Sequence, residues 1–302
     1  MRAAFISLLL VATPLAAALA AGTAGKTPPP QGPPPPVAAP CANPDAIGLS
    51  RTVEIDTTGG PGFGLEQYKA YDFLEPKEVV LTFDDGPQVN TTKAILETLD
   101  AQCTKATFFS IGKMALGLPE LIREVARRGH TIASHTWSHA DLSKKDDKEA
   151  IEEIERGLSA VTRGLGVPIA PFFRFPYLKD SPATLTHLAS RNIATFSMDV
   201  DSFDFKFHNP EQLLKVVMGK LEKKGKGIVL MHDIQPGTAK ALSPLLAELK
   251  AKGYKIVHVK PKEMAKTLAE YDALVEKDVK GLPVAGTERP VTSVVRTVPN
   301  SP

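Results

Sequence analysis

The residues of this sequence best suited to chemistry are two adjacent carboxylates, Asp84 and Asp85, which follow an apolar run at 79–83. Such a run is typical of a buried strand, and the Gly86-Pro87 pair after it predicts a turn. Neighbouring side chains on a strand point to opposite faces, so the turn must re-aim the second carboxylate if both are to reach one pocket. Two carboxylates held together repel each other unless a proton or a cation relieves the charge. The pair therefore suggests a metal site to which other segments contribute.

Further polar residues follow other predicted strands. His135 and His139 are four residues apart, a spacing that places both imidazoles on one face of a helical turn, where they could bind one cation. On its own, such a pair is more often a packed or surface pair. The remaining polar residues after predicted strands are Arg174, Tyr177, Asp199, Asp201, Asp204, His232 and Asp233. This recurrence of Asp, His and Arg at strand ends favours an enzyme.

The elements that must position these residues alternate between strand and helix patterns. Strands are predicted at 79–83, 106–111, 131–134, 172–175, 193–198, 227–231 and 255–259. Helices are predicted at 92–101, 119–128, 148–165, 182–190, 210–223 and 244–251. Short apolar strands that alternate with helices indicate an α/β fold with a parallel sheet covered on both faces. About seven strands suggest a closed or nearly closed barrel, with its active site at the carboxyl ends of the strands.

The composition is that of an ordinary globular protein. Of 302 residues, 43% are hydrophobic and 23% are charged, which allows a sizeable core. The net charge is only +2 and the basic residues are scattered, which argues against a nucleic-acid surface.

The two ends of the chain differ from its middle. Arg2, the apolar stretch 3–20 and small residues through Ala24 predict a signal peptide at 1–24, with an uncleaved membrane anchor as the alternative. Cleavage implies a periplasmic or secreted protein with no membrane insertion afterwards. Residues 25–40 are rich in proline and predict a linker, while 276–302 lack clear periodicity and predict a disordered tail. The folded domain is expected at 41–275.

The only cysteines are Cys41 and Cys103. An exported protein meets an oxidising compartment, so a disulfide between them is predicted, with two free thiols as the alternative. The bond would join the segment after the linker to the end of the first predicted helix.

The collected motifs resemble those of the polysaccharide deacetylases, the carbohydrate esterase family with the NodB homology domain. They occur in the family's order from residue 79 to residue 232. They are Thr82-Phe-Asp-Asp-Gly-Pro87, His135-x-x-x-His139, Arg174-x-Pro-Tyr177, Asp201-x-x-Asp204 and Leu230-x-His232. The resemblance implies a distorted (β/α)7 barrel and metal-dependent removal of acetyl groups from N-acetylated sugars.

The same resemblance implies a catalytic base and a metal site. Asp84 is implied as the general base, and Asp85, His135 and His139 as ligands of one divalent cation. A set of two His and one carboxylate suits Zn²⁺, Co²⁺ or Fe²⁺, and we expect Zn²⁺. The cation would act as a Lewis acid on the acetyl carbonyl.

The other matched positions imply supporting roles. Arg174 would hold Asp84 ionised through a charge-assisted and potentially bidentate bond. Asp204 would pair with His232 and raise its pKa, so that His232 can protonate the departing amine. The backbone N–H of Tyr177 would stabilise the oxyanion, and Leu230 would line the pocket for the acetyl methyl group. One position departs from the family pattern, because Phe205 stands where the family usually has Trp.

The expected function is therefore N-deacetylation of a GlcNAc-containing glycan of the chitooligosaccharide or peptidoglycan type. Two alternatives remain open. One is an O-acetyl esterase acting on an acetylated polysaccharide, and the other is a glycan-binding barrel without turnover. The implied partner is the N-acetylated glycan, and no nucleic-acid partner is expected.

Overall fold

The computed structural model describes residues 41–207 and 209–281. The predicted signal peptide at 1–24, the linker at 25–40 and residues 282–302 of the predicted tail lie outside this part of the chain.

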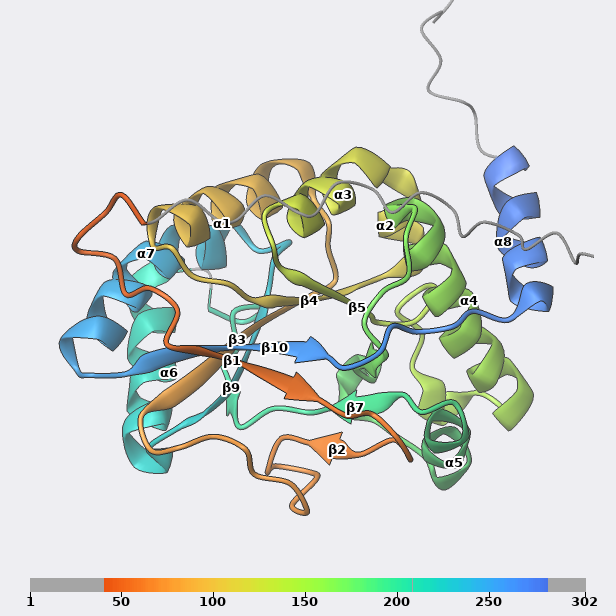
Figure 1. Ribbon diagram of the computed structural model, residues 1–302, viewed down its shortest axis with the longest axis horizontal. Coiled ribbons are helices and arrows are strands. Elements are labelled where there is room, and N and C mark those ends of the chain that lie inside the picture. The colour runs from red at the N-terminus through yellow and green to blue at the C-terminus, as the bar shows by residue number, and fades with distance from the viewer. Residues whose placement is uncertain (1–40, 208, 282–302) are drawn as a thin grey trace, which may run out of the picture. The chain divides into compact units, whose positions relative to one another are not determined.

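Parallel strands form a ring around a common interior (Figure 1). β3 (Glu78–Asp84), β4 (Thr107–Ser110), β5 (Thr131–Ser134), β6 (Phe172–Phe173) and β7 (Ala194–Phe196) are neighbours in chain order. β8 (Val200–Asp201) pairs with β9 (Gly227–His232), and β9 pairs with β3. Within the described residues β7 and β8 are not paired, so the ring is nearly closed. The expected α/β fold with a parallel barrel is confirmed.

The alternation of side chains along β3 places the first carboxylate inside the ring. Val79, Leu81 and Phe83 pack in the large core cluster that the surrounding helices share. Val80 belongs to a second cluster, together with Phe109, Ala133 and Phe196 of other barrel strands. Because successive side chains alternate between the two faces, Thr82 and Asp84 lie on the inner face with Val80. The pairing register also sets Asp84 opposite His232 of β9.

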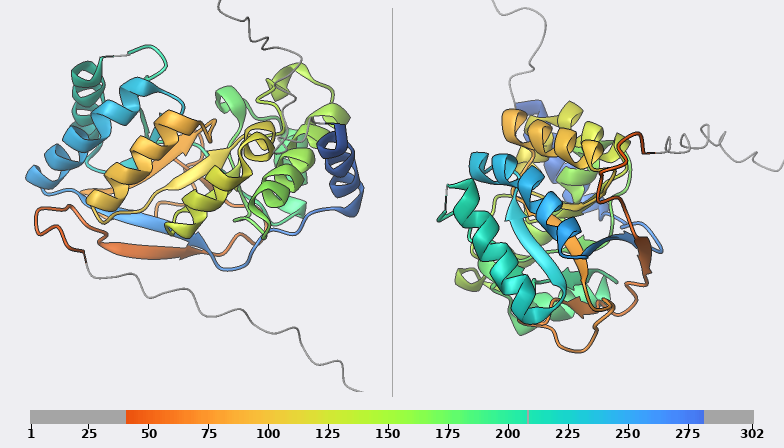
Figure 2. Two further views of the ribbon diagram at one scale, coloured as in Figure 1. Left: turned by 90° about the horizontal axis from the view of Figure 1, so that it is seen from above. Right: turned by 90° about the vertical axis from the view of Figure 1, so that its left-hand side faces the viewer.

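Helices cover the outside of the ring (Figure 2). They are α1 (Val89–Ala101), α2 (Gly112–Gly117), α3 (Pro119–Arg127), α4 (Asp147–Leu165), α5 (Pro182–Ser190), α6 (Pro210–Lys224) and α7 (Pro236–Ala251). Ser181 closes a capping box at the start of α5, as its Ser-Pro sequence suggests. The predicted start of the last helix at residue 244 is wrong. α7 begins at Pro236, which occupies the favourable first position, and Pro244 lies inside the helix.

Three further strands flank the ring, and only one of them was predicted from the sequence. β10 (Lys255–Pro261) was predicted, and it pairs with β3 and with β1 (Arg51–Ile55). β1 and the short β2 (Gly62–Phe63), which pairs with β7, were not predicted. β1 alternates between partly exposed and exposed residues until Ile55, so it lacks the apolar run by which buried strands are recognised.

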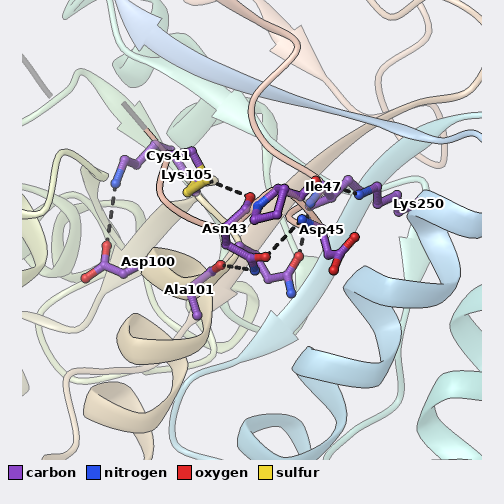
Figure 3. The surroundings of a disulfide bond; sticks show 11 residues. Cys41, Asn43, Asp45, Ile47, Asp100, Ala101, Lys105 and Lys250 are labelled. Carbon is purple, nitrogen blue, oxygen red and sulfur yellow. Dashed lines mark hydrogen bonds and ion pairs between the residues drawn. A yellow bond between two sulfur atoms is a disulfide. The ribbon is translucent and has the colours of Figure 1, made fainter. Parts of the chain in front are cut away.

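The predicted disulfide joins Cys41 to Cys103 with a Cα–Cα distance of 5.7 Å (Figure 3). Next to it, the Asn43 side chain donates a hydrogen bond of 2.9 Å to the carbonyl of Ala101, the last residue of α1. The first described residues are thereby tied to the end of α1, as expected.

The predicted domain boundary at residue 275 does not coincide with the end of an element. A helix, α8 (Ala269–Gly281), crosses it and packs beside α4 (Figure 1). Val275 is buried there against Trp137 and Ala160. Six of the 13 residues of α8 are charged, and its apolar residues gave no clear helical period in the sequence. Among residues 41–207 and 209–281, no helix is both long and apolar enough to cross a membrane.

Candidate active site

Asp85, His135 and His139 meet at the carboxyl ends of β3 and β5. Their ligand atoms all lie within 4.8 Å of one another. Oδ1 of Asp85 lies 3.5 Å from Nε2 of His135 and 3.4 Å from Nε2 of His139. The structure thus brings together the three residues expected to bind the cation.

The donor set fits a divalent metal ion. Nδ1 of His135 lies 2.7 Å from the carbonyl oxygen of Arg174, so it must carry the proton, and Nε2 keeps a free lone pair. Burial lowers the pKa of His135, which favours the neutral form that a metal needs. Oδ1 of Asp85 is buried without a hydrogen-bond partner in the described part of the chain, an arrangement that a cation would relieve. Two imidazoles and one carboxylate are a typical zinc set.

Left-handed backbone conformations orient the side chains of the Asp85–His135–His139 group. Asp85 has a φ of 80°, which turns it to the same side as Asp84. The expectation that His135 and His139 lie on a helical turn is wrong. They occupy an irregular loop, in which Thr136 has a φ of 69° and His139 a φ of 61°. Such values are uncommon for residues other than glycine and cluster at functional sites.

Asp84 is held by a buried arginine. Nη1 of Arg174 donates to Oδ1 of Asp84 at 2.7 Å and lies 2.8 Å from Oγ1 of Thr82. Nη2 donates to the carbonyl of Ser197 at 2.8 Å. The expected bidentate contact with Asp84 is therefore not formed, because the other donors of the guanidinium bind backbone and hydroxyl oxygens. Arg174 is fully buried and acts from behind the pocket wall.

His232 and Asp204 form the second pair. Nδ1 of His232 lies 2.6 Å from Oδ1 of Asp204, whose other oxygen accepts the backbone N–H of His232 at 2.7 Å. Burial alone lowers the pKa of His232. The hydrogen bond and charge of Asp204, together with the charges of Asp84 and Asp85, outweigh it and raise the pKa to about 9. With Nδ1 bound to Asp204, Nε2 is the nitrogen left for a substrate.

A pocket of about 420 Å³ opens over these groups. Asp84, Asp85, His135, His139 and His232 line it. The three residues expected to contact the substrate, Tyr177, Leu230 and Phe205, line it as well. Arg174 and Asp204, which have no exposed surface, support the lining residues from behind.

Two exposed aromatic rings line the pocket. The Tyr177 ring packs 4.9 Å from the His139 ring, and the Phe205 ring lies 5.9 Å from the His232 ring, centroid to centroid. Tyr177 is 61% exposed and Phe205 46%, so both offer apolar surface to a ligand. Tyr177 has a φ of 58°, another left-handed residue at the site.

Several residues at the site received no role from the sequence. Thr238, in the first turn of α7, donates through its hydroxyl to Oδ2 of Asp204 at 2.6 Å. Gln235 lines the pocket, and so does Asp201, which belongs to a matched motif but was given no role. Its place in the Asp201-x-x-Asp204 motif could have identified Asp201 as a site residue. No local sequence pattern indicates a site role for Thr238 or Gln235. Asp199 lies elsewhere, accepting backbone N–H groups of Leu65 and Ile228 at 2.7 Å each.

A parallel barrel with two neighbouring carboxylates and a two-His, one-Asp set at its strand ends is an arrangement that suits metal-dependent hydrolysis. Comparison with known proteins narrows the class of protein. The sequence model of the family described as Polysaccharide deacetylase matches residues 73–195. A chitooligosaccharide deacetylase of Bradyrhizobium is 30% identical over 199 residues, which are 61% of this chain and 90% of that protein. The chain belongs to the polysaccharide deacetylase family.

Two further relatives are named as peptidoglycan deacetylases. The peptidoglycan-N-acetylglucosamine deacetylase of Listeria monocytogenes is 32% identical over 183 residues, or 61% of this chain. The match spans only 38% of the length of that relative. A solved peptidoglycan deacetylase of Bdellovibrio bacteriovorus superposes with a TM-score of 0.66 and 34% identity, over 75% of this chain and 63% of that one.

Proposed function

We propose that this protein is a metal-dependent N-deacetylase that removes acetyl groups from GlcNAc units of a poly- or oligosaccharide. The observation that carries the proposal is the placement of Asp84 and His232 at paired positions of the adjacent strands β3 and β9, where both line one pocket beside the Asp85–His135–His139 group. Amide hydrolysis needs a base and an acid at the same carbonyl, and these two residues supply both.

The first half of the reaction uses Asp84. A Zn²⁺, Co²⁺ or Fe²⁺ ion held by Asp85, His135 and His139 would polarise the acetyl carbonyl and lower the pKa of a water molecule. Asp84 accepts the proton of the attacking water. Arg174 keeps a permanent positive charge 2.7 Å from the Asp84 carboxylate and fixes its orientation. The Tyr177 backbone N–H is proposed to donate to the carbonyl oxygen as it gains negative charge.

The second half uses His232. The hydrogen bond and charge of Asp204 raise its pKa, which favours the protonated form that a general acid needs. It donates this proton to the departing nitrogen, so that the sugar leaves as an amine rather than as an unstable anion. Asp204 holds the ring by Nδ1 and stabilises the charged form, while the backbone and Thr238 bind the other carboxylate oxygen.

The pocket suits a small acyl group on a sugar. Leu230 is proposed to contact the acetyl methyl group, and the exposed rings of Tyr177 and Phe205 to contact the sugar. Phe205 covers less area than the Trp that the family pattern has at this position, and it lacks an indole N–H donor.

Acetate release from a panel of substrates tests the proposal. The metal-loaded protein is incubated with chitooligosaccharides, peptidoglycan fragments and acetylated xylan, with Asp84→Asn as the isosteric control. We expect acetate from an N-acetylated glycan with wild type and a loss of at least about 10²-fold with Asp84→Asn. Release from acetylated xylan alone would support the O-esterase alternative. Binding of a glycan without acetate release would support the non-catalytic barrel.

The composition of residues 1–40 supports a proposal about cellular location. We propose that residues 1–24 are removed as a signal peptide and that 25–40 link the mature N-terminus to the catalytic domain in the periplasm or outside the cell. The Cys41–Cys103 disulfide supports an oxidising compartment. N-terminal sequencing of the exported protein tests this, and an N-terminus retained at Met1 would contradict it.

A further inference from the structure

The loop of residues 135–139, here called the metal loop, carries the only tryptophan of the sequence. Trp137 lies between the two metal-binding histidines and is 9% exposed. It does not line the pocket. Its ring packs outward in a cluster with Ala160 of α4 and Val275 of α8, against which Leu116 and Val279 also pack.

An ion pair reinforces this contact. The Arg156 guanidinium of α4 stacks 4.7 Å from the centre of the Trp137 ring. The same guanidinium donates to Asp278 of α8 at 2.8 Å and to Glu152 at 2.9 Å. Asp278 therefore holds the cation that covers Trp137, and α8 contacts the metal loop both directly and through Arg156.

The metal loop has little freedom to adjust. The N–H of Trp137 donates to the carbonyl of Glu153 at 2.9 Å, and the N–H and hydroxyl of Ser138 bind the carboxylate of the same residue. A Cβ added to Gly157 would lie 2.5 Å from the backbone of Thr136, so α4 touches the loop backbone. Trp137 lies only two residues from each histidine along the chain. A displacement of Trp137 would therefore move both histidines.

We propose that α8 is a positioning element of the metal centre, which sets its affinity for a divalent cation through Trp137. The inference rests on the metal centre of the proposed function. α8 lies outside the barrel and beyond the last matched motif, so it adds nothing to the catalytic residues themselves. By fixing Trp137 it keeps His135 and His139 at the separation a cation requires, which lowers the cost of ordering them on binding.

Two neighbouring acids on α8 provide a matched test. Asp278 pairs with Arg156, which stacks on Trp137, whereas Glu276 pairs with Arg163 at 3.0 Å and does not reach this ring. The two acids are similarly exposed, at 36% and 40%. Their ion pairs should therefore contribute equally little to overall stability.

The experiment measures Zn²⁺ binding to the chelator-treated full-length protein by calorimetry and by Trp137 fluorescence. We expect Asp278→Asn and Val275→Ala to weaken Zn²⁺ binding by roughly 3- to 10-fold, below the roughly 10- to 100-fold cost of losing a direct outer-shell partner. Both should alter the Trp137 emission. Glu276→Gln should leave affinity and emission unchanged, and Asp278→Glu should restore binding. Denaturant unfolding of each variant establishes that it is folded.

The outcomes separate the inference from the proposed function. If wild type binds Zn²⁺ and the folded variants bind it equally well, α8 has no part in the metal centre and the inference is overturned. The same holds if Glu276→Gln weakens binding as much as Asp278→Asn. If wild type binds no divalent cation, the proposed metal centre fails and the inference fails with it.

Discussion

Nη1 of Arg174 donates a 2.7 Å hydrogen bond to Oδ1 of Asp84, and both side chains are buried. The guanidinium also lies 4.3 Å from the ring centre of Phe109, with its remaining donors bound to oxygens of other strands. Arg174 thus joins strands of the barrel beside Asp84, the proposed general base. It compensates the negative charge of Asp84 and also links the strands inside the barrel by hydrogen bonds.

Arg174→Ala should therefore destabilise the fold as well as abolish activity. The change leaves Asp84 as an uncompensated buried charge, a loss of about 3 to 5 kcal/mol in the free energy of unfolding. Urea unfolding measures this. Arg123→Ala is the control, since Arg123 pairs with Glu120 on the surface and its loss should cost no more than about 1 kcal/mol. Equal costs for the two variants would contradict the structural role of Arg174.

Removal of a metal ligand should weaken cation binding. Asp85→Asn and His135→Ala are expected to lower Zn²⁺ affinity by roughly 10-fold or more, since even outer-shell changes have effects of that size. Calorimetry on the chelator-treated protein measures the affinity. His187→Gln serves as control because His187 pairs with Glu155 between α4 and α5, away from the pocket. Unchanged affinity in both ligand variants would place the cation elsewhere.

His232→Ala should reduce kcat on N-acetyl substrates by roughly 10²- to 10⁴-fold, the usual contribution of general acid catalysis. The loss should be smaller on aryl acetate esters, whose leaving groups need little protonation. Steady-state kinetics on both substrates provide the comparison. Equal losses would show that His232 has another role than protonating the leaving nitrogen.

The pH dependence should report the His232–Asp204 pair. The acid must be protonated to act, so activity falls as pH rises through the pKa of His232. That pKa is raised to about 9 without a metal, and a bound cation would lower it because its charge opposes protonation. Asp204→Asn removes the negative charge that raises the pKa, leaves only a weaker neutral acceptor for Nδ1, and keeps the opposing effect of burial. The alkaline limb of the kcat profile should then move to lower pH, and an unmoved limb would assign it to another group.

The disulfide should stabilise the described domain mainly through the unfolded state. Its cysteines are 62 residues apart, for which the chain-entropy model gives about 4 kcal/mol, an upper figure that measured bridges often miss. The double variant Cys41→Ser, Cys103→Ser should lose up to this amount in urea unfolding. Thiol titration of the unfolded, unreduced protein should find no free cysteine, and two reactive thiols would refute the bridge.

Local sequence patterns predicted most barrel strands and the main residues of the candidate site, although the two-residue β8 was not predicted. The apolar run of β3 predicts a buried strand, and its alternation places Asp84 inside, because strand periodicity depends only on neighbouring residues. The motifs then identify Asp85, His135, His139 and His232 by their position at strand ends. All of them line one pocket in the structure.

Contacts between distant segments decided the rest. The single bond from Arg174 to Asp84 depends on the oxygens of Thr82, Phe196 and Ser197, which reach Arg174 only when the strands assemble. The left-handed backbone at Asp85, Thr136 and His139 is unfavourable for these residue types and is imposed by their surroundings, so no local pattern announces it. The position of α8 likewise depends on the packing of Val275 against Trp137. These residues are 138 positions apart (275 − 137), so neither local sequence predicts the contact.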